Sequence, residues 1–440
     1  MRKAYGERME KVELLPTKER KFLFLQGPHG PFFCDLAKIL CEAGAQVEKI
    51  GFNKGDEFCW WDRASYFAFN APADEWEEYF RDKLMMGVTD IVLYGDVRSF
   101  HRVAIAIAKS VGVTVHCFEE GYLRPYWATY ERGGVNGHSV LMDMEIPQMR
   151  TALKRIDEDQ PEAPARWGEL RSHTFYGALY HWQVLFRNRA YPHYRTHRAV
   201  PISQEFMSHA KRLFMMPWRS VKRAYLTRRI KNSSHVYHLV LLQLGHDASV
   251  VDHSPYDGMT GFMRDVARAF AQKAPPHHHL IFKAHPLEDY RIDLEKYAAK
   301  VAPEFDLNGR VHFLHGGKLA AVLDVARSVV TVNSTAGQQA LWRGLPVKTM
   351  GASVYSKKEL TSAQSLGDFF ASPHAPDLPA YRDYRRYLLA TSQISGGFYS
   401  RKSRVRLIRH AVDLVLSDQD PYALLSYSKS APMRQIQLVK

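Results

Sequence analysis

Residues 90–121 read DIVLYGDVRSFHRVAIAIAKSVGVTVHCFEEG and carry the clearest structural signal in the chain. The apolar run Asp90–Tyr94 predicts a buried strand, Arg102–Val111 predicts a helix, and Val113–Phe118 predicts a second strand. A strand, a helix and a strand in this order form a βαβ unit, which joins parallel strands of one sheet. The segment therefore predicts an α/β fold in which the acidic pair Glu119–Glu120 follows a strand.

The same alternation continues on both sides of this segment. Upstream, we expect a strand at Lys21–Gln26, a helix at Phe32–Ala43, a strand at Val47–Phe52 and a helix at Asp74–Met86. Downstream, we expect strands at Val236–Leu244, His279–Lys283, Val311–Leu314, Val329–Val332 and Val347–Met350, with helices at Phe262–Lys273, Leu319–Ala326 and Ala336–Arg343. Two doubly wound halves imply a cleft between them, where ligands meet the carboxyl ends of strands.

Composition and pattern divide the chain into four predicted regions. They are an N-terminal Rossmann-like domain (1–150), a basic, aromatic linker or insertion (151–234), a C-terminal Rossmann-like domain (235–364) and C-terminal helices (365–440). Within the second region, Arg187–Lys231 interleaves Lys and Arg with aromatic residues and is expected to be helical or irregular. The C-terminal helices are inferred from an apolar pattern at Val405, Ile408, Val412 and Val415.

The composition of the 440-residue chain limits its class and its partners. With 46% hydrophobic and 24% charged residues, it is typical of a globular protein rather than a disordered chain. Lys and Arg (60) outnumber Asp and Glu (46), and the net charge of +14 favours an anionic partner such as nucleic acid, lipid headgroups or a nucleotide sugar. No signal peptide and no membrane-spanning run are expected, which favours a cytoplasmic protein. Cys34, Cys41, Cys59 and Cys117 form no CxxC pair, which argues against a disulfide framework and a structural zinc site.

Several familiar active-site motifs are absent from the sequence. No GxGxxG follows a strand, and there is no P-loop, HExxH or GxSxG. His277–His279 and Asp157–Asp159 are the two clusters that resemble metal ligands. Three adjacent histidines at a strand start cannot all face one ion, and the acidic triplet fits a solvated loop better. We therefore expect no metal and no cofactor.

The acidic pair Glu119–Glu120 lies between the strand Val113–Phe118 and Gly121. A carboxylate at a strand end projects into the crevice at the edge of the sheet, and glycine lets a substrate approach the backbone. Partial burial and a like-charged neighbour raise the pKa of a glutamate towards the range useful for proton transfer. The pair is therefore a candidate acid–base site, and the alternative is a solvated turn.

Three polar clusters in the second half resemble phosphate-binding sites. His285–Pro286 follows the strand that ends at Lys283, so the imidazole and the ammonium are expected on one side. Asn333–Thr335 opens a predicted helix, whose first N–H groups suit a phosphate. Gly316–Gly317 leaves backbone room at a third strand end. A surface turn at the first cluster and ordinary helix capping at the second are the alternatives.

The first half has a comparable open loop at Gly27–Pro31, after its first strand. Together with the carboxylate pair, it suggests that transfer chemistry occurs on the first half while the second half holds a donor nucleotide. This is the arrangement of a two-domain glycosyltransferase.

Six motifs in this order resemble the KpsS (LipB) family of capsule polysaccharide proteins. They are QGPHGPFF (26–33), VLYGD (92–96), FEEGYLRP (118–125), ERGGVNGHS (131–139), KAHP (283–286) and TVNSTAG (331–337). The resemblance covers most of the chain, from Lys21 to Thr361. It implies a GT-B-like glycosyltransferase fold, with two Rossmann-like parallel-sheet domains and a cleft between them.

The resemblance also implies an activity, that of a retaining β-Kdo transferase. Such an enzyme takes 3-deoxy-D-manno-octulosonic acid (Kdo) from CMP-β-Kdo and places it on lyso-phosphatidylglycerol, where it starts the capsule linker. Matched to the family motifs, Glu120 assists chemistry at the acceptor, and His285 contacts the CMP phosphate.

The candidate site residues fall into three groups. The catalytic candidates are Glu119, Glu120 and His285. The nucleotide-binding candidates are Lys283, Pro286, Gly316, Gly317, Asn333 and the hydroxyl residues Ser334 and Thr335. The substrate-binding candidates are Gly27, His29, Gly30, Asp96, Gly121 and three arginines for the Kdo carboxylate, Arg98, Arg124 and Arg132.

The resemblance gives the positive charge a role, because donor and acceptor are both anionic. We expect the stretch Arg187–Lys231 to hold the protein peripherally at the inner face of the cytoplasmic membrane. The alternatives are a solvated basic helix face and a stretch that pairs with acidic residues of the protein itself. Other capsule biosynthesis or export proteins are further candidate partners, and nucleic acid is not expected.

Three other functions stay open at this point. The charge alone suggests a nucleic-acid-binding protein, but no RNA- or DNA-binding module signature is present. A non-catalytic component of capsule export would use the basic surface to dock partner proteins. A GT-B transferase for a UDP-sugar or CDP-glycerol would keep the same strand-end clusters.

Overall fold

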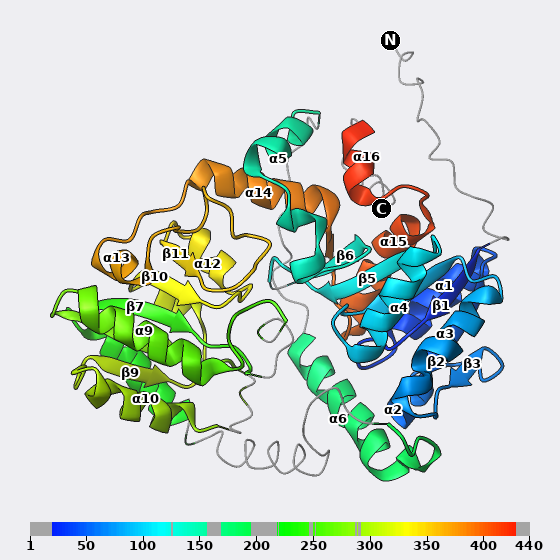
Figure 1. Cartoon of the computed structure of the whole chain (residues 1–440), viewed down its shortest axis with the longest axis horizontal. Helices are drawn as coiled ribbons and strands as arrows, with labels where there is room; N and C mark the ends of the chain where they lie inside the picture. Colours follow the sequence, from blue (N-terminus) through cyan, green and yellow to red (C-terminus); the bar gives the residue numbers. More distant parts are fainter. Residues whose placement is uncertain are drawn as a thin grey trace.

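The computed structural model describes residues 20–124, 126–155, 169–194, 218, 220–245, 250, 252–286, 288 and 292–427. The described chain forms two α/β halves that lie side by side (Figure 1). The helices α5 (Ile146–Leu153) and α14 (Leu378–Thr391) pack against each other at the top of this view. Each half holds one mainly parallel sheet covered by helices, so the GT-B-like α/β fold predicted from the sequence is confirmed.

Seven strands form the sheet of the first half, in the order β12-β6-β5-β4-β1-β2-β3. Its parallel strands are β1 (Lys21–Phe24), β2 (Gln46–Gly51), β3 (Tyr66–Ala68), β4 (Asp90–Tyr94) and β5 (Thr114–Glu120). Two antiparallel strands extend the sheet beyond β5, namely β6 (Trp127–Arg132) and β12 (Gln393–Ser395). The helices along this half are α1 (Phe32–Glu42), α2 (Lys54–Phe58), α3 (Trp76–Met85) and α4 (Ser99–Ser110).

The predicted βαβ unit at residues 90–121 is present as β4, α4 and β5. Its second strand is longer than predicted, because β6 pairs with Glu119 and Glu120, opposite Thr129 and Ala128. The acidic pair therefore occupies the last two positions of a strand instead of a turn after it. Alternate strand residues point to opposite faces, so the two carboxyl groups leave the backbone in different directions.

Five parallel strands form the sheet of the second half, in the order β11-β10-β7-β8-β9. They are β7 (Val236–Leu241), β8 (His278–Lys283), β9 (Val311–Leu314), β10 (Ala326–Thr331) and β11 (Val347–Thr349). The helices are α9 (Met259–Lys273), α10 (Leu294–Glu304), α11 (Ala320–Leu323) and α12 (Gly337–Leu341). α11 is shorter than the helix predicted there because β10 already begins at Ala326, and α10 has no counterpart among the predicted elements.

The chain returns to the first half at its C-terminal end. The region predicted as helical contains α13 (Leu366–Ala371), α14, α15 (Arg401–Leu416) and α16 (Pro421–Tyr427), but also the unpredicted strand β12. α15 packs against α1, and Leu414 shares a buried cluster with Phe32. In the predicted apolar pattern, Ile408 and Val415 are buried, whereas Val405 is exposed.

Two further helices belong to the predicted linker, α6 (Glu169–Arg187) and a helix at 220–232. They confirm helical structure for part of the stretch Arg187–Lys231, of which residues 195–217 and Arg219 lie outside the described residues. Within the described ranges, no helix is both long and apolar enough to cross a membrane.

One buried cluster joins the two halves. It contains Tyr122 and Trp127 of the first half, Leu239 and Ile281 of the second, and Tyr384 of α14. Because protein cores are close-packed, this shared cluster fixes the position of one sheet relative to the other. The site described next depends on that position.

Candidate functional site

A pocket between the two halves is lined by groups from both sheets. Its polar lining consists of Glu119, Glu120, Tyr122, Arg124 and Asn136 from the first half and of Gln243, His253, His285, Asn333, Ser334, Thr335, Ser353 and Tyr355 from the second. The acidic pair and the phosphate-type residues, which the sequence offered as separate clusters, therefore surround one space. A group transfer needs donor and acceptor within reach of each other, and this arrangement provides groups for both.

Two tyrosines hold the carboxylate of Glu120. Its Oε1 accepts the hydroxyl of Tyr94 at 3.2 Å and the hydroxyl of Tyr399 at 3.3 Å. The ring of His173, on α6, packs edge-on against the ring of Tyr399 with 4.5 Å between the centroids. Three segments that are distant in the sequence therefore orient this one side chain.

Glu119 is held by its own backbone neighbour and is desolvated. Its Oε1 accepts the backbone N–H of Glu120 at 2.9 Å. The pKa of Glu119 is raised to about 7: burial is the largest cause and the Glu120 charge adds to it, while the N–H bond and the charge of Arg124 oppose the rise. A carboxyl group with this pKa both holds and releases a proton at neutral pH.

On the opposite wall, Asn333 and Gln243 hydrogen-bond each other twice. Gln243 Nε2 donates to Asn333 Oδ1 at 2.9 Å, and the backbone N–H of Asn333 donates to Gln243 Oε1 at 3.0 Å. The Tyr355 hydroxyl donates to the carbonyl of Ser334 at 2.5 Å. α12 begins at Gly337, one residue later than the predicted start at Ala336, so Asn333 and Ser334 precede this short helix.

A second cavity adjoins the pocket beside Pro286. The predicted residues Gly316 and Gly317 line it, and its charged lining is entirely positive, consisting of Arg223, Arg228, Lys231 and Lys318. A Cβ atom at Gly316 would lie 3.4 Å from the Cα atom of Pro286, so the loop after β8 separates the two spaces. An all-positive cavity suits a phosphate or another anion.

Lys283 lies beside this second cavity and does not line the pocket that contains His285. Its side chain is 4% exposed, and burial, reinforced by the charge of Arg223, lowers its pKa to about 8. β8 ends at Lys283, and His285 lies beyond the strand, where its carbonyl accepts the backbone N–H of Glu288 in a turn. The predicted arrangement of both side chains around one phosphate is therefore not seen.

The three arginines predicted for the Kdo carboxylate have different positions. Arg124 lines the pocket, and its Nε donates to the carbonyl of Gly121 at 3.2 Å. Arg98 donates to Gln26 Oε1 at 2.7 Å and does not line the pocket. Arg132 points elsewhere, because its guanidinium donates to backbone carbonyls at the C-terminal end of α15. Arg124 is therefore the one of the three that reaches the site.

Asp96 and Gly121 support the pocket from outside it. Asp96 is buried, and its Oδ2 accepts the backbone N–H of Val135 at 2.9 Å. A Cβ atom at Gly121 would lie 2.2 Å from the carbonyl oxygen of Trp127, so only glycine allows β5 and β6 to approach here.

The loop Gly27–Pro31 faces α6. A Cβ atom at Gly27 would meet the Phe33 ring at 2.6 Å, and one at Gly30 would meet the ring of Tyr176 at 3.0 Å. The ring of His29 packs against that of Tyr180 with 4.5 Å between centroids. These residues form part of the contact between α6 and the first half, to which α2 also contributes, and they do not line the pocket.

Sequence reasoning missed the tyrosines that hold Glu120. Tyr94 was visible as the last residue of a predicted strand, but nothing in the sequence showed that its hydroxyl meets a carboxylate. Tyr399 lies 279 positions from Glu120, and no local pattern connects them. Such contacts depend on the return of the C-terminal segment to the first half.

Within the part of the chain that the structure describes, no three His, Cys, Asp or Glu side chains gather in an arrangement that could hold a metal ion. The histidine run alternates between two environments. His278 Nδ1 lies 3.0 Å from Nε2 of His238, and His279 Nδ1 lies 2.9 Å from Nε2 of His312.

The family model and two similar curated proteins both point to capsule polysaccharide proteins. The family model described as capsule polysaccharide biosynthesis protein matches residues 89–399. The chain is 31% identical over 387 residues to the capsule polysaccharide export protein KpsS of Escherichia coli, covering 86% of this chain and 97% of KpsS. It is also 31% identical over 408 residues to the capsule polysaccharide modification protein LipB of Neisseria meningitidis serogroup A, covering 88% of this chain and 93% of LipB. A solved structure of KpsC, a β-Kdo 2,7 transferase of Thermosulfurimonas dismutans, aligns with 83% of this chain and 89% of its own, at 13% identity and a TM-score of 0.41.

Proposed function

Because the chain belongs to the family of capsule polysaccharide biosynthesis proteins, we propose that it is a β-Kdo transferase. It moves Kdo from CMP-β-Kdo to lyso-phosphatidylglycerol with retention of the anomeric configuration. The observation that supports this best is the pocket that Glu119 and Glu120 share with His285, Ser334 and Thr335. An acidic pair beside phosphate-type groups, at the carboxyl ends of two Rossmann-like sheets, suits transfer from a nucleotide-activated sugar.

The second half holds the donor in this proposal. His285 and the hydroxyls of Ser334 and Thr335 bind the CMP phosphate, since all three line the pocket. The uncharged ribose and cytosine extend past Pro286 into the second cavity, where the arginine side chains of the lining donate hydrogen bonds to their oxygen atoms. From the first half, the guanidinium of Arg124 binds the carboxylate of the sugar.

The transfer itself exchanges one bond at the anomeric carbon of Kdo. An acceptor hydroxyl oxygen bonds to this carbon on the same face from which CMP departs, and the bond from the carbon to the phosphate oxygen breaks, so the configuration is retained. The bonding electron pair leaves with CMP, whose phosphate His285 stabilises. The acceptor proton passes to Glu120, which Tyr94 and Tyr399 orient. Ionised Glu119 adds a second negative charge, which stabilises the positive charge that develops on the sugar ring as the donor bond breaks.

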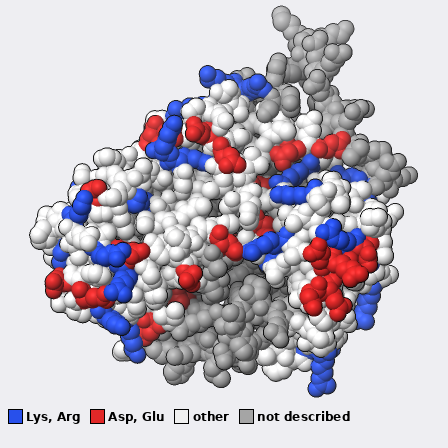
Figure 2. All heavy atoms as spheres, viewed as in Figure 1, with Lys and Arg blue, Asp and Glu red and all other residues white. Residues whose placement is uncertain are grey.

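A lipid acceptor requires access to the inner face of the cytoplasmic membrane. The chain offers exposed aromatic residues for this, and Trp218 and Tyr225 are 71% and 66% exposed. Basic residues on the same segment include the exposed Arg229. This combination is typical of segments that lie at an anionic membrane surface. On the face shown in Figure 2, Lys and Arg are mixed with Asp and Glu, so attraction to a membrane must come from particular elements and not from this face as a whole.

Purified protein incubated with CMP-Kdo and lyso-phosphatidylglycerol tests the proposal. We expect CMP release only when the acceptor is present, a product whose mass equals acceptor plus Kdo, and a β anomer by nuclear magnetic resonance. Turnover with a UDP-sugar or CDP-glycerol instead would overturn the donor assignment. If no activated donor turns over, the protein is not a transferase. The proposed function is then replaced by that of a non-catalytic component of capsule export.

A further inference from the structure

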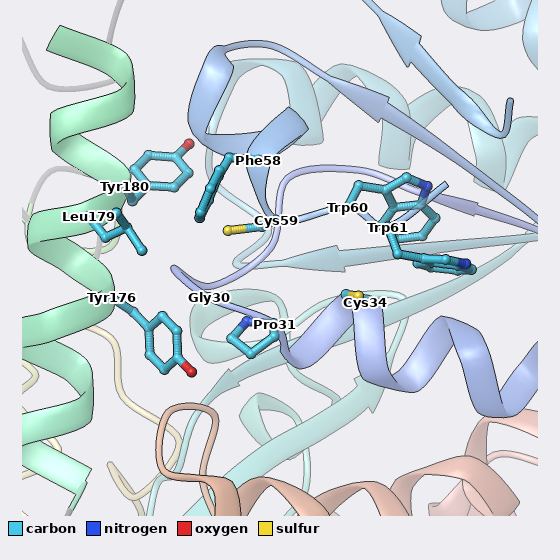
Figure 3. A pocket seen from close by; sticks show the side chains of 10 residues that line it. All are labelled: Gly30, Pro31, Cys34, Phe58, Cys59, Trp60, Trp61, Tyr176, Leu179 and Tyr180. Atoms are coloured by element: carbon cyan, nitrogen blue, oxygen red, sulfur yellow. The ribbon is translucent and has the colours of Figure 1, made fainter. Parts of the chain in front are cut away.

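A cavity beside α6 differs in chemistry from the central pocket (Figure 3). None of the ten residues that line it carries a charged side chain. Tyr176, Leu179 and Tyr180 project from α6 towards the segments that hold Pro31 and Phe58. Its volume is about 240 Å³, so it is large enough for part of a ligand and not only for a few water molecules.

The polar atoms on the cavity wall are neutral or already satisfied. Burial raises the pKa of the thiols of Cys34 and Cys59, which are therefore uncharged at neutral pH. The hydroxyl of Tyr180 accepts a hydrogen bond from Asn53 Nδ2 at 2.7 Å and donates one to Asp56 Oδ1 at 3.0 Å. The tyrosine thus offers its ring and not its hydroxyl to the cavity, so the lining selects an apolar ligand.

Two tryptophans extend the apolar lining. The rings of Trp60 and Trp61 lie 4.5 Å apart between centroids. Trp60 is buried and Trp61 is partly exposed, so the lining runs from the interior to the surface. The ammonium of Lys38 lies 5.6 Å from the centre of the Trp61 ring. An elongated apolar ligand can therefore enter from the surface.

α6 connects this cavity with the proposed acid–base site. His173 packs on Tyr399, whose hydroxyl donates to Glu120. Tyr176 and Tyr180, three and seven residues further along the same helix, line the cavity. At a rise of about 1.5 Å per residue, the cavity therefore extends from about 5 Å to about 10 Å along the helix from His173.

A second face of α6 is apolar and open to solvent. Phe175, Trp182 and Phe186 are 62%, 48% and 61% exposed. Their spacing of seven and four residues places them in one row along the helix. A row of exposed aromatic side chains marks a surface that contacts lipid or another apolar partner. The cavity thus lies next to a surface from which a lipid chain can be delivered.

We propose that this cavity binds the alkyl chain of the acceptor lipid while the lipid headgroup reaches Glu120 along α6. The inference rests on the proposed function, because it assumes that the acceptor is a single-chain lipid. It adds a binding site for the chain and predicts that the first half selects acceptors by chain length.

Binding of hexyl, octyl and decyl phosphate, measured by calorimetry below their micelle concentrations and without sugar donor, tests this site. Affinity should rise about fourfold for each added methylene until the cavity is full. Leu179→Trp fills the cavity and should reduce the affinity for decyl phosphate to that for hexyl phosphate. Ala178→Trp places the same ring on an exposed position of α6 and should leave binding unchanged.

A second variant of the lining keeps the test informative if Leu179→Trp does not fold. Trp61→Ala removes a partly exposed lining ring and should also weaken decyl phosphate binding while hexyl phosphate binding stays unchanged. Equal affinities for the three phosphates, or wild-type decyl phosphate binding by both lining variants, would overturn the site. Chain-dependent binding without Kdo transfer would keep the site and overturn the proposed function. Kdo transfer with a KM that is independent of acceptor chain length would keep the proposed function and overturn the chain-binding site.

Discussion

The carboxyl groups of Glu119 and Glu120 leave the end of β5 in different directions and meet different surroundings. Glu120 accepts two tyrosine hydroxyls, whereas Glu119 is desolvated and accepts one backbone N–H. The first arrangement fixes the position of a carboxylate, and the second raises a pKa. The two residues therefore have different expected phenotypes, although they are chemically identical neighbours.

Glu120→Gln should lower transfer by roughly 100- to 10,000-fold while CMP affinity stays close to wild type. The amide keeps the size of the side chain and its contacts with the tyrosines, but it cannot accept the acceptor proton. Turnover is measured by CMP release, and affinity by calorimetry. Glu78→Gln, an exposed change on α3, is the matched control. Near-normal turnover in Glu120→Gln would remove Glu120 from the chemistry.

Glu119→Gln should have an effect that depends on pH. Because burial raises the pKa of Glu119 to about 7, the wild-type side chain is mostly neutral below that pH and resembles the amide. The ratio of wild-type to variant activity should be close to one near about pH 6 and should increase as pH rises through about 7. The increase follows because above this pH only the wild-type site holds a second carboxylate, which stabilises the positive charge that develops on the sugar ring. A ratio that is constant over this range would show that Glu119 does not titrate there.

At the scale of single elements, the helix at 220–232 has three sides with different environments. Ile230 inserts into the buried cluster that joins the halves. Arg223 and Arg228 line the all-positive cavity, while Tyr225 is exposed. The sequence predicted one basic stretch with one role, because composition does not reveal which side of a helix each cation occupies.

This division predicts separable effects from two pairs of substitutions. Arg223→Gln with Arg228→Gln should weaken CMP binding, with His285→Ala as a positive control, and should change vesicle binding little. Tyr225→Ser with Arg229→Gln should weaken co-sedimentation with anionic vesicles and leave CMP affinity intact. Wild-type vesicle binding should also fall with rising salt, since surface attraction is screened beyond about 8 Å at physiological ionic strength. If both pairs change both measurements alike, the helix does not have two functional sides.

The strands differ in how well the sequence predicts them. β4 was predicted with its correct bounds because it is central and parallel, and such strands are almost continuously apolar. β6 (WATYER) mixes apolar and charged residues, and β12 (QIS) has three residues, so neither carries a recognisable period. Both unpredicted strands lie at one edge of the sheet, next to Glu119 and Glu120.

For the molecule as a whole, the sequence predicted which clusters lie at strand ends but not how they are arranged. The grouping of Glu120 with His285 follows from a general rule, because ligands bind at the carboxyl ends of parallel strands. The separation of Lys283 from His285, and the contact of Tyr399 with Glu120, follow from long-range packing. One sequence without its fold contains no signal for such contacts.

Glu131 should make stability depend on pH. It is 1% exposed, and burial raises its pKa to about 8, although the hydroxyl groups of Ser139 and Tyr122 act to lower it. The folded state therefore holds a proton that the unfolded state releases, so this group's contribution to the free energy of unfolding falls from about pH 4.3 to about pH 8. Glu131→Gln should abolish that contribution, and the variant should gain stability relative to wild type as pH rises through this range.

Urea denaturation midpoints at a series of pH values measure this difference. Comparison of variant with wild type cancels the contributions of other titrating groups, and Glu78→Gln should follow wild type throughout. A constant difference between Glu131→Gln and wild type over the whole range would mean that Glu131 is ionised in the folded protein.

The pairing of β12 with β6 has a consequence for synthesis on the ribosome. β12 is translated about 260 residues after β6, so at about 5–20 residues per second the edge of the first sheet stays open for on the order of 10–50 s. During that time the nascent chain exposes the unpaired edge of β6 and the surface of α1 that α15 later covers. The N-terminal half therefore cannot finish folding co-translationally, and its yield in the cell should depend on chaperones that occupy the growing chain until its last segment emerges.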